Sequence, residues 1–304
     1  MGQRAGLAKL KKFMNRDNTV GYVFSLPFII GFLGFTIIPI LVSFYFSFTN
    51  YNMVSAPKWI GLQNYARMFT DDPRFFKSVL VTFEYVALSV PLKLIFALLV
   101  AVLLTKKTRA VGFYRSVYYL PSLIGGSVAV TLVWKQIFSS RGLLNNIFKS
   151  MGLSRVSWFG DERLAIWPLV LLAVWQFGSS MIIFAAGLKQ IPVSYYEAAR
   201  IDGAGSSKQF FYITLPCLSP VILFNLVMQV ISGFMSFTQV YIISNGTGEP
   251  NDSTNFFALY VYNQAFKYFD MGYASAMAWV LLVIVSIVTL IIFKTSNHWV
   301  FYDN

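Results

Sequence analysis

The sequence predicts an all-α polytopic membrane protein with six transmembrane helices and both termini on the cytoplasmic side. Its 304 residues are 57% hydrophobic and only 12% charged, whereas a soluble domain carries about 25% charged residues. The apolar residues gather in long runs separated by polar segments, which is the pattern of helices that cross a bilayer. This composition excludes an ordinary soluble enzyme.

Six apolar runs are each long enough to cross the hydrocarbon core of a bilayer. They cover residues 20–49, 78–105, 114–138, 164–188, 215–243 and 272–293. The first run is too long for a signal-peptide core, and no small-residue cleavage pattern follows it, so we expect a retained span. The runs predict one membrane domain over residues 20–293, with short tails at 1–19 and 294–304.

The basic residues predict how these spans are oriented. The tail at residues 1–19 is rich in Lys and Arg, and a second basic cluster lies at residues 106–115, after the second expected span. Cytoplasmic loops carry an excess of Lys and Arg. Acidic residues fall mostly in the loops assigned to the opposite side, apart from those of the loop after the fourth span. The bias is mild and favours a cytoplasmic location for both tails.

The most polar long segment between two apolar runs covers residues 191–215, which we expect to form a cytoplasmic hairpin of two short helices. Its helix signals, in chain order, are Pro192, Ser194, Glu197, Gly203, Gly205 and Ser206 or Ser207. The first three predict a helix start with S-x-x-E as a capping box. The glycines predict a helix end, because glycine readily takes the left-handed conformation, and the serines predict an N-cap for the second helix. On geometry alone, an ordinary interfacial hairpin explains the segment equally well.

Neutral polar residues line one face of the fifth expected span. They are Asn225, Gln229, Ser232, Ser236 and Gln239, at spacings of four, three, four and three residues, with Gly233 beside them. The fourth span offers Gln176 and Ser179 next to aromatic rings. Hydrogen-bonding groups beside aromatic rings suit a sugar, whose hydroxyls need donors and acceptors. The alternative is that these side chains hold helices together, as Ser and Gln commonly do in membranes.

Two ionisable residues, Glu84 and Lys93, lie in the second expected span. Nine residues separate them, about 13 Å along a helix, so they do not pair directly within one straight helix. Lys93 either meets a neighbouring helix or a cavity, or extends its ammonium toward the membrane surface.

Catalytic and metal-binding patterns are missing from the sequence. It has one cysteine, Cys217, and one histidine, His298, and it lacks the phosphate-binding, zinc-protease and serine-hydrolase motifs. We therefore predict no catalytic residues, no metal and no cofactor bound by this chain. The formal net charge of +12 does not indicate nucleic acid, because the basic residues lie mostly between apolar runs.

The segment EAARIDGAGSSKQFFYITLP resembles the EAA motif of the permeases of binding-protein-dependent ABC importers. The matching residues are Glu197, Ala198, Ala199, Asp202, Gly203, Ala204, Ile213, Leu215 and Pro216. The segments GLQNYARMF, FYRSVYYLPSL and AGLKQIP look like the carbohydrate, maltose-type branch of this family. The loop SNGTGEP differs from the T-G-G-G-P type sequence that is usual there.

The resemblance implies that residues 20–293 are a permease domain in the plasma (inner) membrane of a bacterium or archaeon. Its implied partners are a second permease, two ATPase subunits that hold ATP and Mg, and an extracytoplasmic sugar-binding protein. The hairpin would dock on one ATPase subunit through Glu197, Ala198, Ala199, Asp202, Gly203 and Ala204. The substrate pathway would be lined by Gln176, Ser179, Asn225, Gln229, Ser232, Gly233 and Ser236.

The function implied is import of a sugar or oligosaccharide by a chain that is not itself an enzyme. An ABC permease for a non-sugar solute is one alternative, and a self-sufficient secondary transporter is another. We find no internal repeat, which disfavours the inverted-repeat architecture of many secondary transporters.

Overall fold

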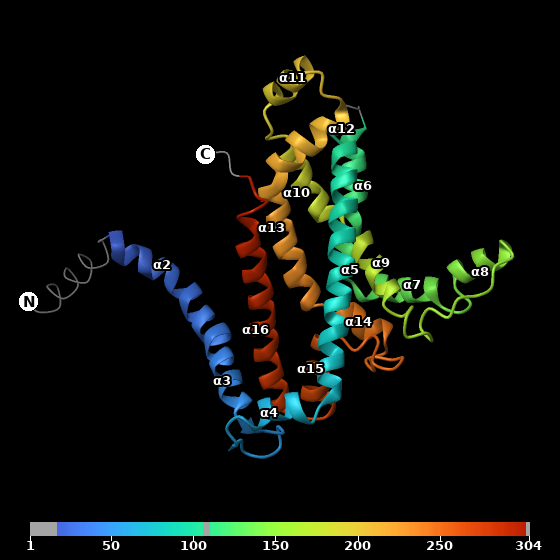
Figure 1. Cartoon of the computed structure of the whole chain (residues 1–304). Coiled ribbons are helices and arrows are strands. Elements are labelled where there is room, and N and C mark those ends of the chain that lie inside the picture. The colour runs from blue at the N-terminus through green and yellow to red at the C-terminus, as the bar shows by residue number, and fades with distance from the viewer. Residues whose placement is uncertain (1–16, 106–109, 302–304) are drawn as a thin grey trace, which may run out of the picture.

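The computed structural model describes residues 17–105 and 110–301 (Figure 1). The predicted all-α fold is confirmed, apart from one antiparallel pair of two-residue strands, β1 (Thr49–Asn50) and β2 (Lys58–Trp59). Most of the basic tail predicted at residues 1–19 lies outside the described residues. So do Lys106, Lys107 and Arg109 of the second basic cluster, and the last residues of the predicted tail at 294–304.

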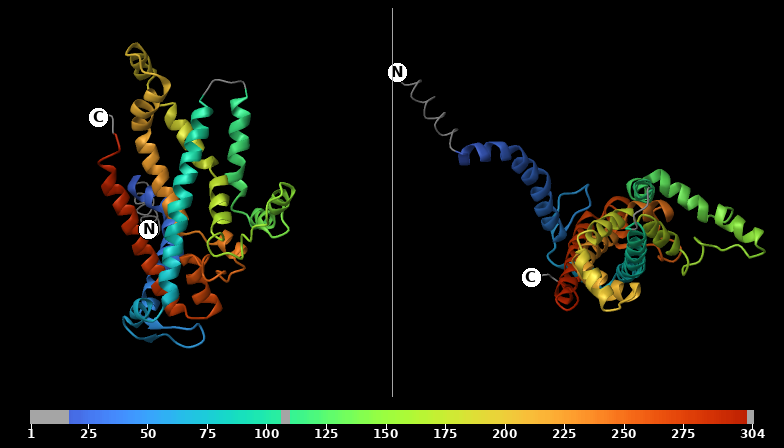
Figure 2. Two further views of the ribbon diagram at one scale, coloured as in Figure 1. Left: turned by 45° about the vertical axis from the view of Figure 1, so that its right-hand side comes forward. Right: turned by 90° about the horizontal axis from the view of Figure 1, so that it is seen from above.

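The chain begins with an arm of helix, α2 (Asp17–Phe32), a π-helical turn η1 (Leu33–Ile37) and α3 (Ile38–Ser47). α3 packs against α16 (Met271–Ser296), while α2 extends away from the other helices (Figures 1 and 2). Large aromatic side chains along the arm, such as Phe24 and Phe35, are more than 80% exposed. A helix that exposes so many large apolar side chains is stable against lipid or another protein, but not against water.

The centre of the bundle is the long helix α5 (Pro73–Leu103), which contacts α9 (Trp167–Trp175), α10 (Gly178–Leu188) and α13 (Leu215–Phe234). Pro91 lies inside α5 without ending it, as neighbouring helices allow in a membrane. Buried Val, Ala, Leu and Phe side chains of these helices form the main apolar core.

Four described helices are long and apolar enough to cross a membrane, and there are up to six spans if each of two bent pairs counts as one. The expected third span, residues 114–138, is such a pair: α6 (Val111–Ile124) and α7 (Val128–Phe138), followed by α8 (Leu143–Ser150), with a bend of 96°. Ser127 accounts for the new helix start, because its Oγ accepts the Val130 N–H as an N-cap. α9 and α10 form the second pair, bent by 43°.

The expected fifth span ends earlier than residue 243. A single helix runs from Ser206 to Phe234, made of α12 (Ser206–Gln209), a π-helical turn η2 (Phe210–Thr214) and α13. Residues 235–237 are not helical, and the short helix α14 (Thr238–Ile243) follows. The second helix of the predicted hairpin is therefore the first part of a long span and not a separate short helix.

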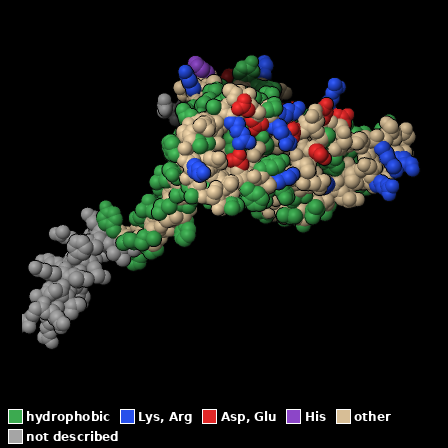
Figure 3. All heavy atoms as spheres, turned by 90° about the horizontal axis from the view of Figure 1, so that it is seen from below, with side chains coloured by type: hydrophobic (Ala, Val, Ile, Leu, Met, Phe, Trp, Pro, Cys, Tyr) green, Lys and Arg blue, Asp and Glu red, His purple; other side chains and the backbone are tan. Residues whose placement is uncertain are grey.

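The end of the bundle opposite α11 (Val193–Ile201) is built from α4 (Gln63–Thr70), α15 (Phe257–Tyr262), the π-helical turn η3 (Asn263–Lys267) and the loop at residues 244–256. We call this the α4 end. Acidic and basic side chains lie close together over it (Figure 3). Two ion pairs contribute: Arg67 with Asp270 at 2.7 Å, and Arg74 with Asp252.

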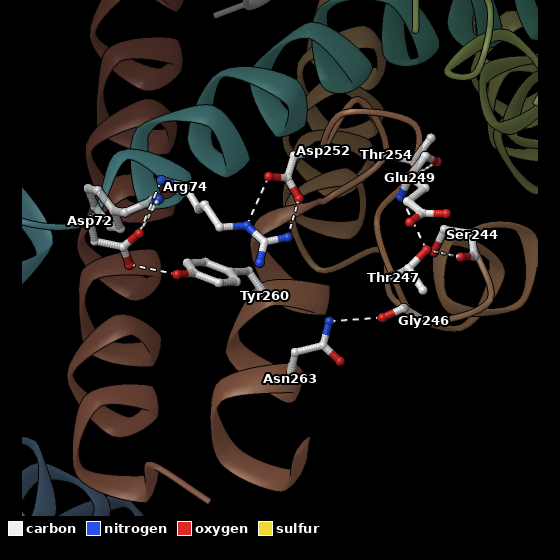
Figure 4. A network of polar contacts seen from close by, with 11 residues as sticks. Asp72, Arg74, Ser244, Gly246, Thr247, Glu249, Asp252, Thr254, Tyr260 and Asn263 are labelled. Atoms are coloured by element: carbon white, nitrogen blue, oxygen red, sulfur yellow. Dashed lines mark hydrogen bonds and ion pairs between the residues drawn. The ribbon is translucent and has the colours of Figure 1, made fainter. Parts of the chain in front are cut away.

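Asp72 organises the polar contacts at the α4 end (Figure 4). Its carboxylate accepts the backbone N–H groups of Arg74 and Phe75 and so caps α5. It also accepts the hydroxyls of Tyr260, at 2.7 Å, and Tyr273. Burial, together with the neighbouring Asp72 carboxylate, raises the pKa of the Tyr260 hydroxyl. The hydroxyl therefore stays protonated at neutral pH and acts as the hydrogen-bond donor to Asp72. One carboxylate thus ties together α5, α15 and α16.

Gly178 allows α10 to approach α6 closely. A Cβ at Gly178 would overlap the carbonyl oxygen of Tyr118 and lie 2.7 Å from the Cα of Tyr119. Backbone atoms cannot yield to a new side chain as a flexible side-chain end can. The spacing of the two helices therefore depends on the missing Cβ.

We expect Gly178→Ala to lower the stability of the folded chain by about 1–3 kcal/mol, because the added methyl group forces the two backbones apart. The measurement is the thermal unfolding midpoint of the purified protein in detergent. Gly112→Ala is the matched control, since a Cβ at Gly112, on the facing helix α6, meets nothing within 4 Å. Equal midpoints for the two variants would show that the close approach is not needed.

Candidate functional site

A polar cavity of about 400 Å³ lies inside the bundle, between α5, α9, α13 and the non-helical residues that follow α13. Its lining includes five of the seven residues predicted for the substrate pathway: Gln176, Gln229, Ser232, Gly233 and Ser236. Gln239 of the same predicted polar stripe also borders it. The volume falls within the range of about 300–1,000 Å³ that is usual for small-molecule sites.

The other two predicted pathway residues, Ser179 and Asn225, are not part of this lining. Asn225 is 1% exposed and donates from Nδ2 to the Val221 carbonyl oxygen in its own helix. That contact fits the helix-packing alternative for this residue. The backbone N–H of Ser179 donates to the Oγ of Ser122.

The polar stripe does not follow one helix face throughout. α13 ends at Phe234, so Ser236 lies beyond it and Gln239 lies on α14. Both residues nevertheless border the cavity, because residues 235–239 form one of its walls. The spacing of the stripe was therefore a valid signal, although the helix geometry behind it holds only as far as Phe234.

Lys93 is the charged residue of the cavity lining. Its Nζ donates to the Oε1 of Gln229 at 2.8 Å, which joins α5 to α13. Lys93 therefore meets both a neighbouring helix and a cavity, and the alternative, extension of its ammonium toward the membrane surface, is not what the structure shows. Glu84 is exposed and does not line the cavity.

Ser122 was not identified from the sequence, although it holds the break between α9 and α10. Its hydroxyl donates to the carbonyl oxygen of Gln176 at 3.1 Å and accepts the N–H of Ser179 at 2.9 Å. Both are backbone groups at the interrupted helix, which would otherwise be unsatisfied in an apolar setting. Gln176, which lies at the break, lines the cavity.

The second candidate site is the hairpin between α10 and α13, which projects beyond the rest of the bundle (Figure 1). It contains α11 (Val193–Ile201), the Gly-Ala-Gly turn and the start of the Ser206–Phe234 helix. The predicted end of α11 is confirmed: Gly203 has φ +75°. The N–H groups of Gly203 and Ala204 bond to the carbonyls of Arg200 and Ala199, as in a Schellman motif.

The predicted caps of the hairpin helices were wrong. Pro192 occupies the N-cap position of α11, with no side-chain cap, and places Ser194 within the helix, so no S-x-x-E capping box forms. Gly205 is the N-cap of α12 in place of a serine. The hairpin is instead held by the hydroxyls of Tyr196 and Thr214, which share a hydrogen bond of 2.9 Å.

The predicted docking residues lie together on this hairpin. Glu197, Ala198, Asp202 and Gly203 are exposed, while Ala199 and Ala204 are half-buried. Two large apolar side chains of α11 are also open to solvent: Val193 is 68% exposed and Ile201 is 88% exposed. An apolar surface at the tip of a projecting hairpin fits contact with another protein.

A helical bundle with an internal polar cavity and a projecting hairpin defines the class as a membrane transport component. The chain belongs to the family of binding-protein-dependent transport system inner membrane components, which matches residues 68–300.

The relatives are permease proteins of transport systems by name. The chain is 53% identical over 304 residues to the "Probable ABC transporter permease protein YesP" of Bacillus subtilis (strain 168), covering 98% of that protein. It is 33% identical to the "Arabinooligosaccharides transport system permease protein AraP" of the same organism, over 91% of this chain and 88% of AraP.

A solved structure shares the fold. One chain of the crystal structure of a bacterial alginate ABC transporter, in complex with an alginate pentasaccharide-bound periplasmic protein, superposes with a TM-score of 0.81. The two chains are 23% identical, and the match covers 95% of this chain and 97% of the other.

We expect the contact between Lys93 and Gln229 to contribute about 1.5–3 kcal/mol, the usual range for a hydrogen bond to a charged group. A double-mutant cycle with Lys93→Met and Gln229→Leu, followed by thermal or denaturant unfolding in detergent, measures this coupling. Additive effects of the two substitutions would mean that the two side chains do not interact.

Proposed function

We propose that this chain is the permease subunit of an ABC importer for a sugar or oligosaccharide, and that it forms half of the membrane pathway. Membership of the family supports the transport role, and names such as that of AraP support a saccharide cargo. The cavity lining adds amide and hydroxyl groups beside the rings of Tyr85 and Phe237, a combination suited to sugar hydroxyls and C–H faces.

The observation that carries the proposal is the single helix from Ser206 to Phe234. It begins at the hairpin and ends at the cavity wall, where Gln229 and Ser232 lie. A force applied to the hairpin is thereby transmitted along one continuous element to the residues that face the cargo. An ATPase subunit bound at the hairpin would use this helix to open and close the pathway.

The proposed assembly contains a second permease, two ATPase subunits that bind ATP and Mg, and a sugar-binding protein outside the membrane. This chain performs no catalysis in that assembly, binds no cofactor or metal, and binds no nucleic acid. It crosses the plasma membrane six times, with each bent pair counted as one span. Both termini and the hairpin lie in the cytoplasm, and the α4 end faces outward.

Partner-dependent transport tests this proposal. Proteoliposomes that contain the complete assembly should take up labelled oligosaccharide only when ATP and the binding protein are both present. Liposomes with this chain alone should show no flux. Flux through the chain alone would favour a self-sufficient transporter, and uptake restricted to amino acids or inorganic ions would favour a non-sugar cargo.

Two substitutions at Gly203 separate the shape of the hairpin from its contact with the ATPase. Gly203 has φ +75° and open space around it, so the strain of a new side chain comes from the backbone. A left-handed conformation costs an L-residue roughly 1–2 kcal/mol, although Asn tolerates it better than most residues.

We therefore expect Gly203→Val to lower ATP-driven uptake by roughly tenfold, in line with that cost, whereas Gly203→Asn keeps most of it. The measurement is the initial rate of uptake at equal amounts of membrane protein. Loss of uptake in both variants would assign Gly203 to a contact that excludes any side chain. Normal uptake in both would contradict the role of the hairpin in coupling.

A further inference from the structure

Lys93 brings a positive charge into the cavity without a carboxylate to balance it. None of the residues that line the cavity in the described part of the chain is acidic. The hydrogen bond to Gln229 supplies an acceptor but no negative charge. Lys93 is half-buried in the cavity, and an ammonium group that has lost part of its hydration is stabilised by a negatively charged partner.

The described acidic residues offer no partner nearby. Glu84 is the one acidic residue that lies within the candidate spans of the described chain. It is nine residues from Lys93 on α5, and at 100° per residue that places it half a turn away, on the opposite face. Tyr85 is the other titratable group that borders the cavity. Its hydroxyl is no counterion.

Lys135 shows what a lysine in a structural role looks like in this chain. Its Nζ donates to the Ile242 carbonyl oxygen, at 2.7 Å, and to the Oδ1 of Asn245, and so fastens α7 to the end of α14. By contrast, Lys93 has a single hydrogen bond in the described structure. Two of its three N–H donors remain for a ligand.

We propose that Lys93 binds a carboxylate of the cargo, so that the transported saccharide carries a uronic acid. This inference rests on the proposed function and narrows its substrate class. The ammonium would hold the carboxylate by charge-assisted hydrogen bonds. Gln229, Gln176 and Ser232 would meet hydroxyls of the same sugar. The cargo would then supply the missing negative charge of the cavity.

The test uses the purified complex of this chain with its partner permease and ATPase subunits, without the binding protein, so that only the cavity is probed. The ligands are four uronates (galacturonate, glucuronate, mannuronate and guluronate) and their neutral parent sugars, at millimolar concentrations. The readout is the ligand-induced shift of the thermal unfolding midpoint, converted to an affinity for each sugar.

We expect at least one uronate to bind the wild-type complex more tightly than its neutral parent sugar. Lys93→Met should lower the affinity for that uronate by roughly ten- to a hundredfold and leave the affinity for the neutral sugar nearly unchanged. Lys93→Arg should keep the preference, because it keeps the charge. The matched control is Lys294→Met, which removes a charge from an exposed residue near the end of α16, outside the cavity lining.

Three results would overturn the inference. One is that neutral sugars bind and no uronate binds better than its neutral parent. That result would contradict the preference for a charged cargo but would remain consistent with the proposed sugar transport. Another is that Lys93→Met retains the uronate preference. The third is that Lys93→Met destabilises the ligand-free complex with no change in preference, which would assign Lys93 to a carboxylate of the partner permease. Absence of binding by every sugar would count against the proposed function as well.

Discussion

Backbone N–H and carbonyl groups inside this apolar bundle need partners, and that requirement limits where the helices can be broken. The interruption between α9 and α10 exists because Ser122 serves two backbone groups at once, the carbonyl of Gln176 and the N–H of Ser179. Gln176 lies at this interruption and lines the cavity. The close approach that brings Ser122 into range depends in turn on Gly178. The geometry of this break, at one wall of the cavity, thus depends on one hydroxyl and one missing Cβ.

The two candidate sites are parts of one mechanical element. The Ser206–Phe234 helix carries cavity residues near one end and the hairpin at the other. The hairpin itself is kept in shape by the left-handed turn at Gly203 and the contact between Tyr196 and Thr214. Its orientation relative to the helix is therefore fixed, while its tip stays exposed. At the far end, Asp72 ties α5 to α15 and α16, which anchors the bundle there.

The sequence predicted the features that depend on periodicity and on single strong residues. The long spans around α5, α13 and α16, the turn at Gly203 and the five predicted pathway residues that line the cavity were all predictable, because each rests on local pattern. The breaks in the third and fourth spans were not. Ser122 and Ser127 look like ordinary polar residues of a span. The role of Ser122 depends on contacts with another helix, and Ser127 caps α7 only because the chain bends there. The capping box failed because α11 begins at Val193, after Pro192 as its N-cap, so that Ser194 lies inside the helix.

The position of Lys93 connects recognition to the rest of the molecule. Lys93 lies on α5, the helix that contacts α9, α10 and α13, and it reaches Gln229 on α13. A ligand held between these two side chains touches both helices at once. Because α13 is continuous with the start of the hairpin, the proposed binding of cargo between α5 and α13 would be coupled to the position of the surface that carries Glu197. The same geometry works in reverse, since a movement of the hairpin changes the distance between Lys93 and Gln229. The charge therefore lies where it can act both on which cargo is held and on when it is released.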